Sequence, residues 1–453
     1  MKKSGQLQYR ERLRALSDRL IELQRPIRIL DAIKWPGDVQ AAFLRHDGKR
    51  LPRIPADHYR KQSLGFEPAR LREEFRELRG DISRQLGRGD GLGRILRQTV
   101  DQYLMVIDLL DNRGTPEFGR LSRQLYGSAR DHMRGDRKTL RQLGERLGEI
   151  FSMPGALHLA RPYERDISAG TAVTVLQQQL ENFFQPGDIR VMLSDGIVSD
   201  AAAGGDYIKI NQDADFTDFD LKVLEVHEGW VHVGTTLNGR QQPWASWLSV
   251  GSPRVTACQE GLAVLMETLT LSSYPARALK VSDRVTAVDM AEEGADFVEV
   301  YRYFRERDMS EKAAYTITQR VFRGGMPEGG AAFTKDLSYL RGFVENVNFI
   351  RSAIQSGVPE ILPMLFVGKL TLDDIPTLYE YYLEGTIAGP HYIPDMFRDL
   401  NGLYVWFGFA SGISAINMAR VQRHYARLFA SLPKGSPLYE KVIDSVVNED
   451  DGS

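Results

Sequence analysis

The most informative residues for chemistry lie in the segment HEGWVH, which contains His227, Glu228 and His232. Neutral imidazoles bind zinc, and a carboxylate beside them can take a proton from a water molecule. A His and an acid, followed by three residues and a second His, is expected by chance only about 0.02 times in a chain of this composition. The pattern therefore favours a Zn²⁺ site with its own general base.

The spacing of the two histidines sets a condition on the local backbone. In a regular α-helix, residues five apart point about 140° away from each other and cannot share one ion. A π-type turn inserts one residue and brings the two side chains to the same face, and Gly229 lowers the cost of such a distortion. Either a π-type turn lies between His227 and His232, or they are not ligands of one metal.

A third ligand is needed for an open catalytic zinc site, and the single cysteine, Cys258, makes a Cys-rich structural site impossible. The segment QEGLAVLME places Glu260 in an otherwise apolar helical stretch. A buried carboxylate is costly unless it is paired or binds a metal. From the spacing alone, a metal ligand and a salt-bridged core residue explain Glu260 equally well.

The elements that must position these residues can also be predicted. Thr217 and Asp220 form a capping-box pattern and GTTLNG contains stop signals, so a helix over residues 218–233 is expected. The β-branched runs IRVMLSDG and DYIKINQ predict a small sheet just before it. Residues 207–210 can form an edge strand that holds a substrate backbone, or an ordinary strand.

Composition places the chain among folded proteins: 453 residues, with 42% hydrophobic and 26% charged. We predict an α+β fold that is mostly helical. Residues 1–150 contain 32 Lys and Arg against 21 Asp and Glu, a net +11, and the remainder carries 26 against 39, a net −13. We therefore expect a basic helical N-terminal region (1–155), a catalytic domain (156–435) and an acidic C-terminal tail (436–453).

The positive charge of the first region has two explanations. It can bind an acidic protein partner, or the arginines can form solvated helix faces and pair with the acidic half of the same chain. No nucleic-acid motif is present, so nucleic acid is not expected as a partner. The most apolar segment, 403–416, is shorter than the ~20 residues that span a bilayer. We expect no membrane partner and, with one cysteine and no secretion signal, a cytoplasmic protein.

An ordered series of motifs runs through the second half of the chain: HEGWVH, NGRQQP, QEGLAVLME, RVFRGG, TKDLSYLRG and GKLTLDD. Together they resemble the QEGLA-motif domain family, which includes bacterial proteins and the eukaryotic microtubule-associated tyrosine carboxypeptidases. The resemblance implies a zincin-like metallopeptidase core with an HExxxH helix. It also implies that His227, His232 and Glu260 bind the zinc ion and that Glu228 is the general base.

The same resemblance suggests a substrate. A carboxypeptidase needs a cation for the terminal carboxylate and a donor for the oxyanion. Arg320, Arg323 and Lys335 are candidates for the first role and Tyr339 for the second. We expect hydrolysis at the C-terminus of a peptide or protein, with release of a residue that can be aromatic. The alternatives are a regulatory or protein-binding module that keeps the zinc site without turnover, and hydrolysis of a non-peptide amide.

Overall fold

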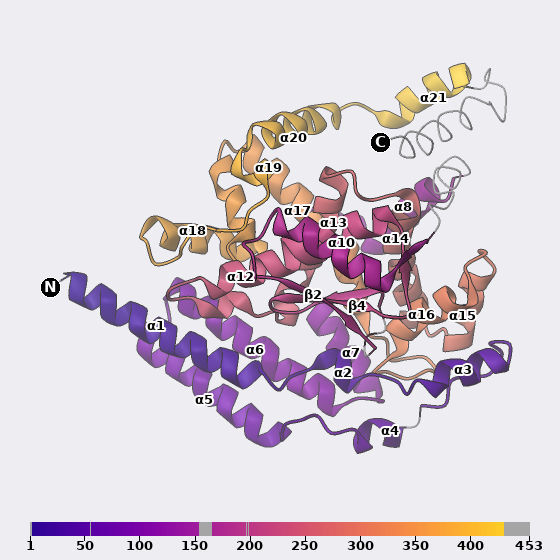
Figure 1. Ribbon diagram of the computed structural model, residues 1–453, viewed down its shortest axis with the longest axis horizontal. Coiled ribbons are helices and arrows are strands. Elements are labelled where there is room, and N and C mark those ends of the chain that lie inside the picture. Colours follow the sequence, from indigo (N-terminus) through magenta and orange to yellow (C-terminus); the bar gives the residue numbers. More distant parts are fainter. Residues whose placement is uncertain (1, 55, 154–164, 196, 198, 430–453) are drawn as a thin grey trace. The chain divides into compact units, whose positions relative to one another are not determined.

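The computed structural model describes residues 2–54, 56–153, 165–195, 197 and 199–429. They are mostly helical, with two small sheets (Figure 1), which confirms the expected class. Met1–Asp399 form one compact unit and Leu400–Ser453 a second. The expected domain boundary near residue 155 and the expected acidic tail both fall outside the described residues.

The N-terminal region is helical, as its composition predicts. In the helical hairpin of α5 and α6, the Glu67 side chain caps α5 by accepting from two backbone amides, and the Asp90 side chain accepts from Gly93 N at the start of α6. The hydroxyls of Tyr9 and Tyr381 both donate to Asp90, at 3.0 and 2.9 Å, so this turn is tied to two distant segments. The helices are α1 (Lys2–Gln24), α2 (Ile29–Ala32), α3 (Asp38–Arg45), α4 (Ala56–Lys61), α5 (Pro68–Leu86), α6 (Gly91–Asp111), α7 (Pro116–Tyr126) and α8 (Leu140–Phe151).

This region shares a hydrophobic core with the C-terminal half. Trp35 and Phe43 pack with Phe297, which belongs to the later part of the chain. Trp35 Nε1 donates to the Tyr59 hydroxyl at 2.7 Å, and that hydroxyl accepts from the Gly324 amide at 2.8 Å in the RVFRGG motif. The N-terminal helices therefore support the loops that follow the QEGLA motif.

Part of the positive charge of residues 1–150 is used inside the chain. Arg130 pairs with Glu293 at 2.6 Å, and Arg134 pairs with Asp373 at 2.6 Å. Arg141 lies 3.3 Å from Asp289. These pairs agree with the explanation in which basic residues of the first region contact the acidic half. An acidic protein partner stays a prediction.

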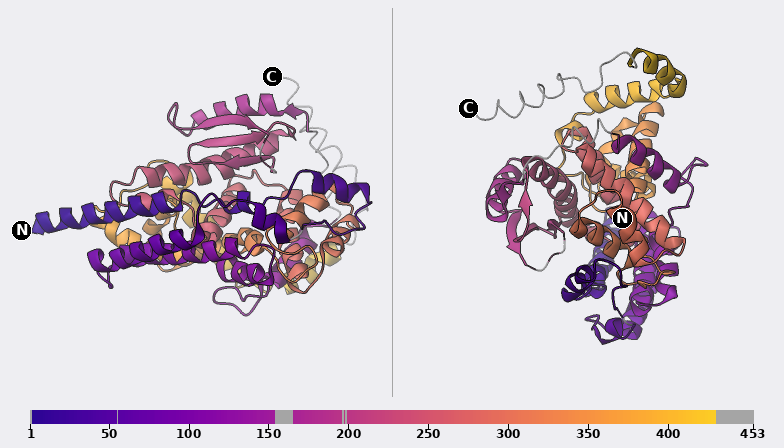
Figure 2. Two further views of the ribbon diagram at one scale, coloured as in Figure 1. Left: turned by 90° about the horizontal axis from the view of Figure 1, so that it is seen from below. Right: turned by 90° about the vertical axis from the view of Figure 1, so that its right-hand side faces the viewer.

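The small sheet lies ahead of the HEGWVH segment, as the β-branched runs predict. Its order is β2-β4-β3: β2 (Arg190–Ser194) is parallel to β4 (Tyr207–Asn211), and β3 (Ala201–Ala203) is antiparallel to it. Helix α10 (Ala169–Glu181) contacts β2 and β4 and lies along the sheet in Figure 2. The expected edge strand at 207–210 is central instead, because both of its sides are paired. A second pair joins β1 (Ile167–Ser168) and β5 (Asp215–Phe216).

A long helical segment follows, made of α11 (Asp218–Leu224), a π-helix η1 (Glu225–Val233) and α12 (Gly234–Arg240). The predicted Thr217–Asp220 capping box is present. The predicted end at residue 233 is wrong, because the helix continues to Arg240. In α12, Asn238 donates to the carbonyls of Phe366 and Tyr392, both at 2.7 Å. Asn238, which belongs to the predicted stop signal GTTLNG, therefore stays inside the helix and bonds to distant segments of the chain.

The later helices complete the first unit. Helix α13 carries the QEGLA motif and packs along α17, and α14 lies against α8. The elements are η2 (Ser246–Ser249), α13 (Pro253–Leu269), α14 (Pro275–Glu292), α15 (Phe297–Arg305), α16 (Glu311–Phe322), η3 (Thr334–Leu337), α17 (Ser338–Gln355), η4 (Pro359–Phe366), η5 (Leu372–Asp374), α18 (Ile375–Leu383) and α19 (Asp395–Arg398).

The described part of the second unit consists of α20 (Asn401–Ile413) and α21 (Met418–Phe429). Helix α20 buries Leu403, Phe407 and Ser411, which follow one another at intervals of four residues along one face. Among the described residues, no helix is both long enough and apolar enough to cross a bilayer.

Candidate metal centre

The backbone between the two histidines is a π-helix, which is the alternative that lets both side chains reach one metal ion. Residues Glu225–Val233 form the π turns, and α-helical turns continue on either side. The wider turn brings the His227 and His232 rings to a centroid distance of 4.9 Å. Gly229 has a second role beyond easing the distortion, since any Cβ at this position would overlap the Leu180 side chain of α10.

Three potential ligand atoms converge at this point. Glu260 Oε2 lies 3.6 Å from His227 Nε2 and 3.7 Å from His232 Nε2. The three ligand atoms all lie within 4.8 Å of one another. Two imidazole nitrogens and one carboxylate oxygen match the donor set of a catalytic zinc site with an open fourth position. The residues present therefore fit a zinc ion.

The second nitrogen of His227 is held by a carboxylate. His227 Nδ1 and Glu267 Oε1 lie 2.6 Å apart, and both side chains are buried. Arg277 donates to both oxygens of Glu267, each at 2.6 Å. Burial raises the pKa of the Glu267 carboxyl, but Arg277 and His227 outweigh it and lower the pKa to about 2. The ionised carboxylate orients the imidazole so that Nε2 faces Glu260.

The negative charges of Glu260 and Glu267 are paired with positive side chains of the protein itself. Lys335 donates to Glu260 Oε1 at 2.8 Å, while Oε2 faces the histidines. Burial lowers the pKa of His227, but Glu260 and Glu267 outweigh it and raise the pKa to about 10. The pKa of the Glu260 carboxyl lies well below its usual range, because Lys335 and the two histidines outweigh its burial. The site is thus built around ionised carboxylates.

Two glycines set the distance between the helices that bring these groups together. A Cβ on Gly261 would overlap the backbone of Gly342 in α17, and a Cβ on Gly342 would overlap the carbonyl of Ala257 in α13. Helix α13 supplies Glu260, and Lys335 lies just ahead of α17. The glycine of QEGLA and the last glycine of TKDLSYLRG therefore permit the close helix crossing that places Lys335 on Glu260.

Glu228 lies one residue from His227 and faces the sheet. Its Oε2 accepts a hydrogen bond from the Ala203 amide at 3.0 Å. Ala203 is in β3, and within the part of the chain that the structure describes β3 pairs with β4 alone. The edge strand next to the candidate base is therefore β3, and its backbone orients the Glu228 carboxylate.

The residues predicted to bind substrate fall into different environments. Arg320 donates to both oxygens of buried Asp336, each at 2.6 Å, and Lys335 contacts Glu260. Arg323 lies over the Phe333 ring, 5.7 Å from its centroid. Burial, together with the charge of Arg320, lowers the pKa of Arg323 to about 10. Arg320 and Lys335 are therefore engaged by carboxylates of the chain itself.

Tyr339 lies beside the metal centre. Its ring stacks on that of His227 at a centroid distance of 6.4 Å and an interplanar angle of 24°. The guanidinium of Arg284 covers this ring at 3.8 Å. Among the described residues, Arg284 forms no ion pair with a carboxylate, although its charge, with that of Arg320, outweighs burial and helps to lower the pKa of nearby Asp336. Arg284 and Tyr339 together form a polar group next to the three ligands.

Several functional candidates could not be recognised from the sequence. Arg277 lies in none of the motifs. Glu267 is the last residue of QEGLAVLME and shares a helix face with Glu260, but its spacing does not reveal its contact with His227. Lys369 of GKLTLDD donates to the His232 carbonyl at 3.1 Å and to Gln259 of QEGLA at 3.0 Å. Burial lowers the pKa of Lys369 to about 8. The motifs GKLTLDD, HEGWVH and QEGLAVLME thus contact one another around the candidate metal centre.

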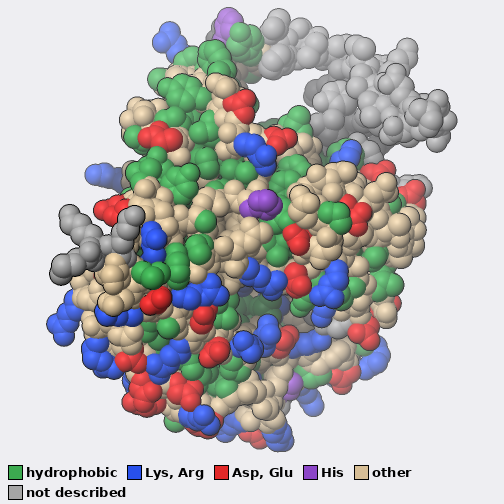
Figure 3. All heavy atoms as spheres, turned by 60° about the vertical axis from the view of Figure 1, so that its left-hand side comes forward, with side chains coloured by type: hydrophobic (Ala, Val, Ile, Leu, Met, Phe, Trp, Pro, Cys, Tyr) green, Lys and Arg blue, Asp and Glu red, His purple; other side chains and the backbone are tan. Residues whose placement is uncertain are grey.

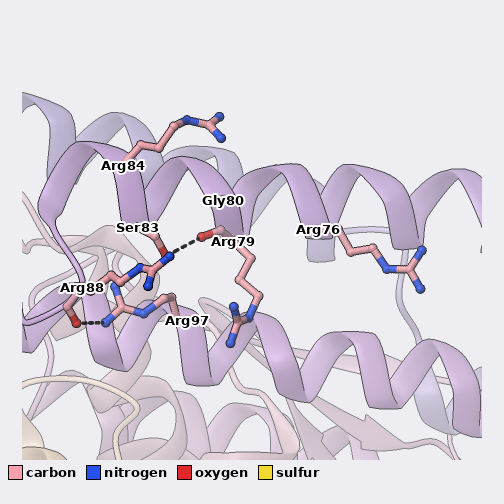
Figure 4. A pocket seen from close by; sticks show the side chains of 7 residues that line it. All are labelled: Arg76, Arg79, Gly80, Ser83, Arg84, Arg88 and Arg97. Atoms are coloured by element: carbon pink, nitrogen blue, oxygen red, sulfur yellow. Dashed lines mark hydrogen bonds between the residues drawn. The ribbon is translucent and has the colours of Figure 1, made fainter.

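A separate basic pocket of about 750 Å³ lies on the α5–α6 hairpin and is lined by Arg76, Arg79, Gly80, Ser83, Arg84, Arg88 and Arg97. Figure 4 shows that Arg76 and Arg84 extend away from Arg88 and Arg97 rather than toward a common centre. Arg79 is paired with Asp101 at 2.6 Å, and Arg97 donates to the Gly87 and Arg88 carbonyls. The arginines of this pocket do not converge on one ligand position.

Comparisons with known proteins agree with the motif series. No curated protein matches the chain. The sequence model of the microtubule-associated tyrosine carboxypeptidase family matches residues 41–415, which include the candidate metal ligands, Arg284, Lys335 and Tyr339. The chain therefore belongs to the microtubule-associated tyrosine carboxypeptidase family.

Proposed function

We propose that this protein is a zinc-dependent carboxypeptidase with a zincin-like core. The observation that carries the proposal is the convergence of His227, His232 and Glu260 within 4.8 Å, with Glu228 on the same π-helix. A purely structural metal site has no use for a carboxylate base beside its ligands. Family membership adds the reaction class, because the family is named for release of a C-terminal tyrosine.

Each residue of the centre has a defined task in this proposal. A zinc ion held by His227, His232 and Glu260 would polarise the scissile carbonyl and lower the pKa of the attacking water. Glu228 accepts a proton from that water and delivers it to the leaving amine. The Ala203 amide holds the Glu228 carboxylate in place at 3.0 Å. Lys335 occupies Glu260 Oε1 and so leaves Oε2 for the metal.

The terminal carboxylate of the substrate requires a cation that is not already neutralised. Arg320 forms a bidentate pair with Asp336, and Lys335 is bound to Glu260. Neither Arg284 nor Arg323 forms an ion pair with a carboxylate among the described residues. Of the two, Arg284 lies over Tyr339 at 3.8 Å, beside the candidate ligands. Arg323 lies over Phe333 at 5.7 Å instead. We therefore assign the carboxylate contact to Arg284, and the hydrogen bond to the oxyanion to Tyr339.

The reaction is tested with zinc-loaded protein and peptides that end in tyrosine, alanine or aspartate, each as the free acid and as the C-terminal amide. Mass spectrometry should show loss of one residue from the free acids, fastest for tyrosine, and no cleavage of the amides. Efficient internal cleavage of the amides would contradict the carboxypeptidase assignment. Bound zinc without cleavage of any peptide would favour the protein-binding module.

The role of Arg284 has its own test. Arg284→Gln should raise KM for the free-acid peptide at least about ten-fold, because a charge-assisted bond to the carboxylate is lost. The matched control is Lys280→Gln, one helical turn earlier on α14, which should leave KM unchanged. Equal KM values for the two variants would remove Arg284 from the substrate site.

A further inference from the structure

Helix α20 exposes an unusual number of large apolar side chains. On the side opposite its buried stripe, Val405, Phe409 and Ile413 follow one another at one-turn intervals, with exposed fractions of 56%, 69% and 59%. Trp406 is exposed to 58% and Tyr404 to 47%. Most soluble surfaces do not expose a contiguous patch of this kind. Hydrophobic side chains gather in this part of the chain, at the top of Figure 3.

A shallow apolar hollow runs along this face. It encloses about 660 Å³, and its described lining residues all belong to α20, among them Val405, Trp406, Phe409 and Ile413. The apolar character continues past the helix, since Ile416 is exposed to 55% and Met418 to 67%. The patch therefore extends from α20 into the start of α21.

Charge distinguishes the possible occupants of this patch. From Leu400 to Tyr439 the sequence contains no acidic residue and four basic ones, Arg420, Arg423, Arg427 and Lys434. On α21 the exposed Arg420 and Arg423 lie on the opposite side from Met418 and Val421. The segment is therefore amphipathic and basic.

A second copy of the chain does not suit this surface. A two-fold dimer would bury the apolar patch against itself, but it would leave the arginines on the opposite side of α21 without an acidic partner from residues 400–439 of the second copy. An anionic bilayer complements both features. Trp and Tyr favour the membrane interface, and arginines are attracted to acidic headgroups.

We propose that residues 401–426 form a surface that binds anionic lipid headgroups, with α20 lying in the interface rather than crossing it. The sequence-based expectation of no membrane partner rested on the length needed to span a bilayer. A helix that lies along the surface does not need that length. Arg420 and Arg423 contact the headgroups, while Trp406 and Phe409 enter the apolar boundary.

The experiment uses the full chain and co-sedimentation with vesicles of phosphatidylcholine alone or with roughly one third phosphatidylserine. Binding should be about ten-fold stronger to the anionic vesicles and should fall as salt is raised, because the contacts with the headgroups are electrostatic. Equal binding to the two vesicle types, or no binding to either, would overturn the proposal.

Variants identify the surface. Trp406→Ser with Phe409→Ser should abolish vesicle binding, and Arg420→Gln with Arg423→Gln should weaken it about ten-fold. All four side chains are exposed, so the variants should keep the thermal stability of the parent. Leu383→Ser is the matched control, because Leu383 is exposed to 68%. Vesicle binding that is unchanged in the variants would overturn the assignment. The assignment would also be overturned if the parent protein formed a dimer that the substitutions dissociate and bound no vesicles.

Discussion

His227 Nδ1 lies 2.6 Å from Oε1 of Glu267, and Glu267 is in turn clamped by Arg277. This contact decides which nitrogen of the imidazole is available to a metal. It also joins the HEGWVH motif to Glu267, the last residue of the QEGLAVLME motif. A carboxylate behind a ligating histidine fixes the tautomer and makes the other nitrogen a better donor.

Glu267→Gln is predicted to weaken zinc binding about ten- to hundred-fold, because the amide does not hold the imidazole as an ionised carboxylate does. Arg277→Gln should act in the same direction. The measurement is competition with a fluorescent zinc chelator. Lys280→Gln serves as the control on the same helix as Arg277, and a similar loss of affinity in that variant would show that the effect is not specific to the His227 contact.

Glu228→Gln should separate metal binding from turnover. The amide oxygen can still accept from the Ala203 amide, but the side chain no longer takes a proton, so kcat should fall by about 10² to 10⁴. Zinc content measured by elemental analysis should stay near one per chain. Glu260→Gln should instead lose zinc, because a neutral amide is a poor ligand for this ion. Full activity of Glu228→Gln would exclude it as the base.

Zinc uptake should release a proton. The metal-free site holds His227 protonated, because Glu260 and Glu267 raise its pKa to about 10, and zinc binds only the neutral ring. A proton is therefore displaced at every pH below that pKa, and zinc affinity should rise about ten-fold per pH unit near neutrality. Calorimetry in buffers of different ionisation enthalpy measures the number of protons directly. A value of zero would mean that His227 is neutral before zinc binds.

Gly261→Ala should destabilise the fold, because its Cβ would overlap the backbone of Gly342 and force α13 and α17 apart. We expect a loss of about 1–3 kcal/mol in the free energy of unfolding, measured by denaturant titration. Zinc affinity should fall as well, since Lys335 and Glu260 are held by the same crossing. Gly170→Ala on α10 is the control: a Cβ there meets only Ser168 Oγ at 4.0 Å, so stability should be kept or raised.

The sequence predicted the helical class, the small sheet and the capping box at Thr217, because each depends on neighbouring residues. It predicted the π-type turn on the condition that His227 and His232 share one metal ion. The helix end near residue 233 was wrong, since Asn238 finds its partners in residues far along the chain. The role of Glu267 could not be predicted for the same reason. Its partners are His227, forty residues earlier, and Arg277 on the next helix.

The candidate substrate cations show a similar limit. Composition and motif placed Arg320 and Lys335 near the site but could not reveal that Asp336 and Glu260 neutralise them. Arg284 lies in no motif and became visible only through its position over Tyr339. Charge in a sequence is therefore a poor guide to charge available to a ligand.

The π-helix has an evolutionary consequence. Deleting one residue between His227 and His232 would give the four-residue spacing of ordinary zinc-peptidase helices and would remove the extra residue of the π turn. Because a π turn takes up its extra residue locally, the helix after it would keep its facing. Thr235, which bonds Gln259 at 2.9 Å, and Asn238, which bonds four backbone groups, would then keep their partners. The two spacings are therefore separated by a single deletion that leaves the contacts of the later part of the helix intact.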